Sequence, residues 1–240
     1  MDWNNMCQTF NDKDNVWSWQ YTCEIFPDLL DAMWVTISAT FVAYFVALIL
    51  GLFLTLGRRS PIRPVKWFFQ GFLEFVRGTP PLVQLFFIYF GFPEIPYIGF
   101  EMSAFTAGVL GLGIHYSTYV SEIYRSGIEA VPKSQWEASK ALNFSKGQTW
   151  LRIVLPQAIP PVIPMLGNYL ITMFKETPLL AAITLMEMLN MAKFIGAKYF
   201  DYLEPFTIVG FLFLLLSYPS AILVSKLEKR MNRRFRQKNA

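Results

Sequence analysis

Long stretches without a charged side chain constrain this chain more than any other feature of its sequence. Residues 32–57, 102–121 and 153–174 each lack Asp, Glu, Lys and Arg entirely. A helix needs about 20 consecutive, mostly apolar residues to cross the hydrocarbon core of a bilayer. Charged residues make up only 16% of the 240 residues, whereas soluble domains contain roughly 25%. The sequence therefore predicts an all-α, polytopic membrane protein.

The apolar stretches predict about five transmembrane helices in one domain. The spans are expected over roughly 30–57, 67–91, 102–127, 151–174 and 206–225. By this division, residues 1–27 form an extracytoplasmic segment, residues 28–228 the transmembrane domain, and residues 229–240 a basic cytoplasmic tail. The first 27 residues lack the basic region and apolar core of a cleavable signal peptide.

Lys and Arg are unevenly distributed between the two sets of loops. The loop after the first span carries Arg58, Arg59, Arg63 and Lys66, and further basic residues follow the third and fifth spans. The alternate segments hold few, among them Lys193 and Lys198. Because Lys and Arg accumulate in short cytoplasmic loops, we expect the N-terminus outside and the C-terminus in the cytoplasm.

Cys7 and Cys23 are the only cysteines, and both precede the first expected span. They can form a disulfide if this segment faces an oxidising compartment, and otherwise remain two free thiols. The chain contains no CxxC sequence and no His/Cys cluster, so no metal site is expected.

Residues 131–158 form a polar island between apolar segments. Ser134 and Glu137 have the spacing of a capping box, in which the serine side chain caps a helix, and so do Ser145 and Gln148. Asn143 lies where a helix favours a residue with left-handed backbone conformation. This stretch is therefore predicted to be a helix, a tight turn and a second helix.

The same stretch resembles the EAA motif of ABC importer permeases. Glu137-Ala138-Ser139, Asn143, Ile153 and Leu155-Pro156 carry the resemblance, with Ser139 in place of the usual Ala and Asn143 in place of the usual Gly. The resemblance implies a cytoplasmic coupling helix that docks on a separate ATPase subunit. The residues expected to form this coupling site are Glu137, Ala138, Ser139, Ala141, Leu142 and Asn143.

Two intramembrane sequences, RGTPPL at 77–82 and KETPLL at 175–180, resemble each other, with a basic residue shortly before a Thr-Pro pair. Proline breaks a helix, and broken helices within a membrane often mark a transport path. We therefore expect a solute pathway that includes Arg77, Thr79, Glu122, Lys175, Glu176 and Thr177. The alternative is a packed Arg77–Glu74 or Lys175–Glu176 contact without a role in transport.

Charge type suggests what such a pathway would bind. Arg77 or Lys175 could face the carboxylate of a zwitterion, and Glu176 or Glu122 its cationic group. His115, the lone histidine, is expected to form a hydrogen bond between helices rather than to relay protons.

Wider stretches resemble polar amino-acid permeases of the histidine/glutamine type. FVRGTPPLVQLFFIYFG, STYVSEIYRSGIEAVPKSQWEA and FKETPLLAAIT carry this resemblance, which spans roughly residues 28–230. FKETPLL and the final third look most like permeases for ectoine. The family implies the type I ABC importer permease fold in the bacterial cytoplasmic membrane. It also implies an ABC ATPase dimer, a second permease subunit in a homo- or heterodimer, an extracytoplasmic solute-binding protein and surrounding lipid as partners, and no nucleic acid.

The chain lacks a Walker A sequence, so ATP and Mg²⁺ are expected on the partner ATPase, with no cofactor in this chain.

Two other functions are less compatible with the sequence. An intramembrane enzyme would need a catalytic cluster, yet there is one His and no Asp between Asp31 and Asp201. A channel would need a selectivity filter, and no such motif occurs.

Overall fold

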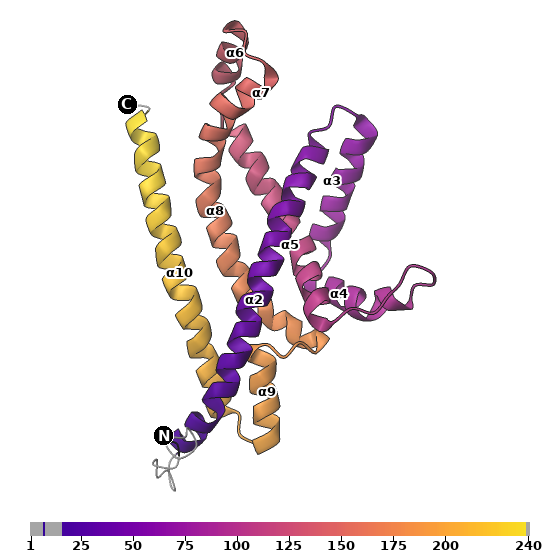
Figure 1. The fold of residues 1–240 in the computed structure, drawn as a ribbon, viewed down its shortest axis with the longest axis vertical. Coiled ribbons are helices and arrows are strands. Elements are labelled where there is room, and N and C mark those ends of the chain that lie inside the picture. Colours follow the sequence, from indigo (N-terminus) through magenta and orange to yellow (C-terminus); the bar gives the residue numbers. More distant parts are fainter. Residues whose placement is uncertain (1–6, 8–15, 239–240) are drawn as a thin grey trace.

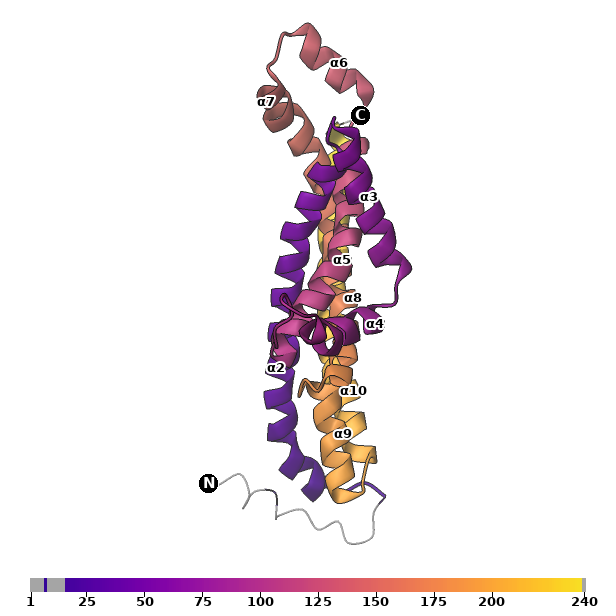
Figure 2. The same ribbon diagram turned by 90° about the vertical axis from the view of Figure 1, so that its right-hand side faces the viewer.

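The computed structural model describes residue 7 and residues 16–238, and these are almost entirely helical, with no β-strand among them. Long helices α2, α5, α8 and α10 run along the length of the molecule (Figures 1 and 2). Their bounds are Trp19–Arg58 for α2, Ala104–Glu129 for α5, Leu155–Glu176 for α8 and Leu203–Lys238 for α10. The predicted all-α fold class is confirmed.

Shorter helices connect these four. They are α3 (Arg63–Gly78), α4 (Pro81–Phe86), α6 (Lys133–Ala141), α7 (Lys146–Gln148) and α9 (Met188–Tyr199). Two π-helical segments, η1 (Phe87–Gly91) and η3 (Thr149–Val154), and two 3₁₀ segments, η2 (Phe92–Glu94) and η4 (Thr177–Ile183), complete the described elements.

Three helical stretches in the described part of the chain are long and apolar enough to cross a membrane. They are Trp19–Arg58, Lys146–Ile183 and Leu203–Met231. Helix α5 lies among them and buries about half of its residues, which include the polar side chains of His115, Thr118 and Ser121. The second expected span is interrupted, because α3 ends at Gly78 and α4 begins at Pro81.

Close packing of α2 against α5 forms the centre of the bundle. Small residues recur every fourth position on α2, at Ala39, Ala43, Ala47 and Gly51, and all four are buried. Positions four apart lie on the same face of a helix. A Cβ atom added at Gly51 would lie 2.6 Å from Cγ1 of Val120 on α5. Small residues let two membrane helices approach closely, and this stripe provides that approach.

Helix α9 packs beneath this core, at the end of the molecule where α2 begins (Figure 1). Met188, Ala192 and Ile195 join Leu29 of α2 and Leu212 of α10 in one apolar cluster. The buried side chain of Glu187 caps α9 by accepting hydrogen bonds from the backbone N–H groups of Leu189 and Asn190, at 3.0 and 2.8 Å. The cap stabilises the start of α9, and the cluster fixes α9 against the first and last long helices.

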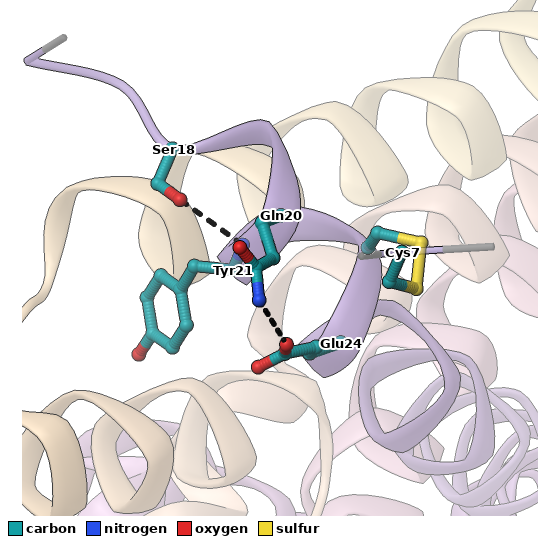
Figure 3. The surroundings of a disulfide bond; sticks show 6 residues. Cys7, Ser18, Gln20, Tyr21 and Glu24 are labelled. Atoms are coloured by element: carbon teal, nitrogen blue, oxygen red, sulfur yellow. Dashed lines mark hydrogen bonds between the residues drawn. A yellow bond between two sulfur atoms is a disulfide. The ribbon is translucent and has the colours of Figure 1, made fainter. Parts of the chain in front are cut away.

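A disulfide joins Cys7 to Cys23, and Cys23 lies in the first turns of α2 (Figure 3). Ser18 caps the same helix, because its hydroxyl accepts a hydrogen bond from the backbone N–H of Tyr21 at 3.1 Å. Helix α2 begins at Trp19 and continues through Pro27. The expected boundary after residue 27 therefore lies within a continuous helix.

Replacing Gly51 by Ala should destabilise the protein by about 1–3 kcal/mol, because the added methyl group overpacks the α2–α5 contact. Gly71→Ala is the matched control, since a Cβ at Gly71 meets nothing within 4 Å, and it should be neutral or stabilising by up to about 1 kcal/mol. Thermal unfolding of both variants in the same detergent compares them. Equal melting temperatures would contradict the assigned role of Gly51.

Candidate functional site

The turn between α6 and α7 has a well-defined backbone structure. Asn143 adopts φ 56°, in the left-handed region. The backbone N–H of Phe144 donates to the carbonyl of Ser139 at 3.0 Å, and that of Asn143 to the carbonyl of Lys140 at 2.9 Å. This pair of bonds is a Schellman motif, which terminates a helix. The predicted left-handed conformation at Asn143 is confirmed.

Of the two predicted capping boxes, only the second is formed. Both bonds of the box are present between Ser145 and Gln148. The first prediction is wrong: α6 begins at Lys133 with Pro132 as its N-cap and no side-chain cap. Ser134 is thus already inside the helix, which begins two residues earlier than the capping-box spacing predicts.

Most of the expected coupling residues lie on the surface of this hairpin. Glu137, Ala138, Ala141, Leu142 and Asn143 are exposed, and Leu142 retains 69% of its accessible area. Ser139 differs, because it is buried and its hydroxyl accepts a hydrogen bond from Thr149 at 3.3 Å. Ser139 therefore holds α6 to the following segment and is not on the exposed face.

Aromatic and apolar contacts join the hairpin to the long helices. The rings of Trp136 in α6 and Trp150 in η3 meet edge to face, with centroids 5.5 Å apart. Both pack against a buried cluster that includes Val131 and Val154. The guanidinium of Arg59, just after α2, lies 5.7 Å from the centroid of Trp150. Packed side chains thus connect α6 to α8 and to the end of α2.

A single carboxylate, Glu122 of α5, holds three arginines from three helices. Its oxygens lie 2.7 Å from Arg58 of α2, 3.3 Å from Arg77 of α3 and 2.7 Å from Arg125 of α5. Arg125 also pairs with Glu129 at 2.6 Å. The structure therefore brings together Arg77 and Glu122, two of the expected pathway residues.

Neither of the alternative contacts is formed. Among the described residues, Arg77 pairs with Glu122 and not with Glu74, and Lys175 makes no ion pair with Glu176. Lys175 is exposed at the end of α8, and Glu176 beside it is half-buried. These two lie apart from the arginine cluster.

Three tyrosines inside the bundle, Tyr116, Tyr119 and Tyr169, lie between the arginine cluster and Glu176, and we call them the aromatic belt. The guanidinium of Arg77 lies 5.6 Å from the ring centroid of Tyr119, which stacks on Tyr169 at 5.7 Å. Tyr116 contacts both tyrosine rings and lies near enough to Glu176 for electrostatic interaction. The belt thus has a cation at one end and a carboxylate at the other.

The break between α3 and α4 is fixed by one side chain. The amide of Gln84 donates to the Val76 carbonyl at 2.7 Å and to the Thr79 hydroxyl at 2.6 Å. Its carbonyl oxygen lies 3.2 Å from Nδ1 of His115 on α5. The structure thus shows the expected contact of His115 with another helix. Thr79 does not cap α4, whose N-cap is Pro80.

The second break has a similar local chemistry. The α-helix ends at Glu176, and residues 177–183 continue as a 3₁₀ segment. The hydroxyl of Thr177 is buried and donates to the carbonyl of Phe174 at 2.7 Å. Thr177 therefore satisfies the end of α8 with its own side chain.

Sequence reasoning missed Arg58, Gln84, Tyr119 and Tyr169. A signal existed on α5, where His115, Tyr119 and Glu122 are spaced i, i+4 and i+7 and so share one face. Nothing in the sequence indicates that Arg58, at the end of the first span, reaches the same carboxylate.

Replacing Glu122 by Gln should cost about 1–3 kcal/mol of stability, because three guanidinium groups lose their shared carboxylate in a partly buried setting. Glu129→Gln is the control: Glu129 is half exposed and pairs with one arginine, so its loss should cost less than about 1 kcal/mol. Thermal unfolding at low and high salt measures both. Equal effects of the two substitutions would show that the cluster does not depend on Glu122.

Comparison with known proteins shows the family. Residues 25–233 match the family described as binding-protein-dependent transport system inner membrane component. A probable amino-acid ABC transporter permease protein, y4tG of Sinorhizobium fredii, is 44% identical over 85% of this chain and 87% of its own length. The arginine transport system permease protein ArtQ of Bacillus subtilis is 36% identical, covering 79% and 86%.

Solved structures agree in fold. A crystal structure of an amino acid ABC transporter with histidines matches with a TM-score of 0.80 and 32% identity, covering 96% of this chain and 99% of that one. The MetNI methionine ABC transporter matches with a TM-score of 0.69 at 18% identity, covering 87% and 98%, which supports the fold alone. The relatives are transporter subunits and not enzymes, as predicted. The chain therefore belongs to the family of binding-protein-dependent transport system inner membrane components and is the permease component of an amino-acid ABC importer.

Proposed function

We propose that this permease carries a zwitterionic amino acid or a similar solute across the bacterial cytoplasmic membrane, driven by a separate ATPase through α6. The observation that carries the coupling role is the exposed face of α6, held on a Schellman turn and wedged against the long helices by Trp136 and Trp150. A surface held in this way can pass a displacement of α6 on to the long helices without changing its own shape.

The coupling site comprises Glu137, Ala138, Ala141, Leu142 and Asn143, with Ser139 supporting them from inside. Leu142 supplies an apolar contact at the tip, since its side chain is mostly exposed. Closing of an ATPase dimer, with ATP and Mg²⁺ bound there, would move α6, and α8 and α5 would move with it. Rigid motion of helices around a fixed site is the usual basis of alternating access.

The solute pathway follows the aromatic belt. Arg77 would face the carboxylate of a zwitterion, and Glu176 its cationic group, with Tyr119 and Tyr169 between them. Glu122 holds Arg77 in place, and Thr79 and Thr177 define the helix breaks beside the path. Lys175, exposed at the end of α8, is a second candidate for the carboxylate. Ectoine, a zwitterion with the same charge types, is a specific candidate solute because of the resemblance of FKETPLL and the final third.

The distribution of basic residues between the ends of the bundle supports the proposed orientation. The α2–α3 loop, α6 and the C-terminal end of α10 lie at one end, and the first turns of α2 and α9 at the other (Figure 1). The first of these ends carries Arg59, Arg63 and Lys133, so it is assigned to the cytoplasm. The Cys7–Cys23 disulfide then lies outside, where oxidation is favoured.

The functional assembly would contain a second permease, identical or related, together with the ATPase dimer and an external solute-binding protein. To test the proposal, the chain would be co-purified with its ATPase, and ATP hydrolysis would be measured with binding protein loaded with amino acids or ectoine. Stimulation by one solute class supports the proposal and names the solute. Failure of the ATPase to co-purify would contradict it.

Asn143→Val should reduce the solute-stimulated ATPase rate roughly five-fold or more, because a β-branched residue is strained at positive φ and the turn that presents α6 would distort. Asn143→Gly is the matched control and should keep the rate, since glycine adopts this conformation freely. The assay is the same ATPase measurement in lipid nanodiscs. Full stimulation with Val at this position would exclude the coupling role of the turn.

The proposed orientation predicts the labelling of thiols in intact cells. Cys7 and Cys23 should react with a membrane-impermeant maleimide only after a reductant opens the disulfide. A Ser134→Cys substitution in a Cys7→Ser, Cys23→Ser background should react only after the membrane is permeabilised, because Ser134 is exposed on α6. Labelling of this introduced thiol in intact cells would reverse the orientation.

A further inference from the structure

A cavity of about 400 Å³ lies where the end of α2, the start of α3 and the end of α5 meet. Four cationic side chains line it: Arg58, Arg59, Lys66 and Arg125. The only acidic side chain that the structure describes in its wall is Glu129, and Thr55, Ser60 and Gln70 complete the lining. This cavity is separate from the aromatic belt and from the exposed face of α6.

Two of the four positive charges have no carboxylate partner. Arg58 pairs with Glu122, and Arg125 pairs with both Glu122 and Glu129. Within the described part of the chain, Arg59 and Lys66 form no ion pair, and the guanidinium of Arg59 lies against the ring of Trp150. Both side chains are exposed. The cavity thus presents two unneutralised cations to whatever enters it.

An apolar groove of about 970 Å³ opens from the same place and shares Thr55, Arg59 and Ser60 with the basic cavity. Side chains of α2, α5 and α8 form its walls, among them Leu52, Leu56, Ile159 and Ile163. From Arg59 to Leu52, α2 rises about 10 Å at roughly 1.5 Å per residue. The groove therefore extends from a charged mouth toward the middle of the membrane-spanning helices.

We propose that this composite site binds an anionic phospholipid. Its phosphate would lie between Arg59 and Lys66, and one acyl chain would follow the groove past Leu56 and Ile159. Basic pockets between membrane helices on the cytoplasmic side are suited to anionic headgroups. An acyl chain matches the apolar walls of the groove, whereas the charged groups of a zwitterionic solute would find few partners there. The assignment to the cytoplasmic leaflet depends on the proposed orientation, whereas the binding itself does not.

A second copy of the chain is a less suitable occupant of the groove. The exposed charged residues at this end are mostly basic, including Arg63, Lys133 and Lys146, so a facing copy would place like charges opposite one another. Like charges in contact disfavour association. An anionic headgroup supplies the missing negative charge, and its tail matches the apolar wall.

The site also has a mechanical consequence for the permease. Arg59 contacts Trp150, which packs against Trp136 in α6. A phosphate bound at Arg59 would therefore touch the same series of side chains that joins α6 to α2. Anionic lipid is expected to bind next to the contacts that join α6 to α2 and to influence the resting position of these helices.

The test is retention of lipid by the intact protein, measured by native mass spectrometry after purification from nanodiscs of phosphatidylcholine with and without phosphatidylglycerol. Wild-type protein should retain phosphatidylglycerol roughly five-fold or more over phosphatidylcholine, as expected for a basic site between membrane helices. An Arg59→Gln, Lys66→Gln variant should lose this preference. An Arg63→Gln, Lys226→Gln variant removes the same charge from exposed positions outside the cavity and should keep it.

Further measurements distinguish a bound lipid from a free anion and from a second copy of the chain. Leu56→Trp should narrow the groove and reduce retention while all cations remain. Millimolar inorganic phosphate should not displace the lipid; displacement would identify a free-anion site and overturn the proposal. Equal retention by both charge variants would also overturn it, as would cross-linking of two copies through Leu56→Cys. The measurement does not use transport, so it stands or falls separately from the proposed function.

Discussion

The contact between α2 and α5 is the constraint on which the remaining structure depends. Water cannot drive helices together inside a bilayer, so association relies on close packing and on hydrogen bonds between helices. The small residues of α2 supply the first, and the Thr55 hydroxyl, 3.1 Å from the hydroxyl of Ser121, supplies the second. With this pair fixed, α5 presents His115, Tyr119 and Glu122 to α3, α4 and α8. The ion-pair cluster and the aromatic belt are thus attached to one face of a single central helix.

Two different kinds of contact connect the ends of the bundle to that core. At the α6 end, the packing of Trp136 against Trp150 joins the hairpin to the long helices through bulky rings. Beside it, Glu122 joins α2, α3 and α5 through charge, which tolerates small shifts in geometry better than packing does. The permease therefore combines a stiff connection to the α6–α7 hairpin with a more compliant one around the arginine cluster. Such a division would suit the proposed motion of the helices as units.

Much of the fold could be predicted from the sequence, because uncharged length and proline position are local signals. The breaks after Gly78 and Glu176, the left-handed Asn143 and the capping box at Ser145 all follow from residues close together in the chain. The arginine cluster could not be predicted in the same way. Arg58 and Glu122 are 64 residues apart, and only the crossing of α2 and α5 places them together. The burial of Ser139 likewise depends on Thr149, across the turn.

The π-helical segment η3, at Thr149–Val154, lies directly between the α6–α7 hairpin and α8. A π-helical turn accommodates one more residue than an α-helical turn, and each residue of an α-helix corresponds to about 100° of rotation. The wide turn thus sets the rotational phase of everything that follows it. Loss of a single residue here would leave the apolar composition of α8 intact yet turn Tyr169 away from Tyr119. The angular alignment of the aromatic belt is therefore determined about four helical turns before Tyr169 is reached.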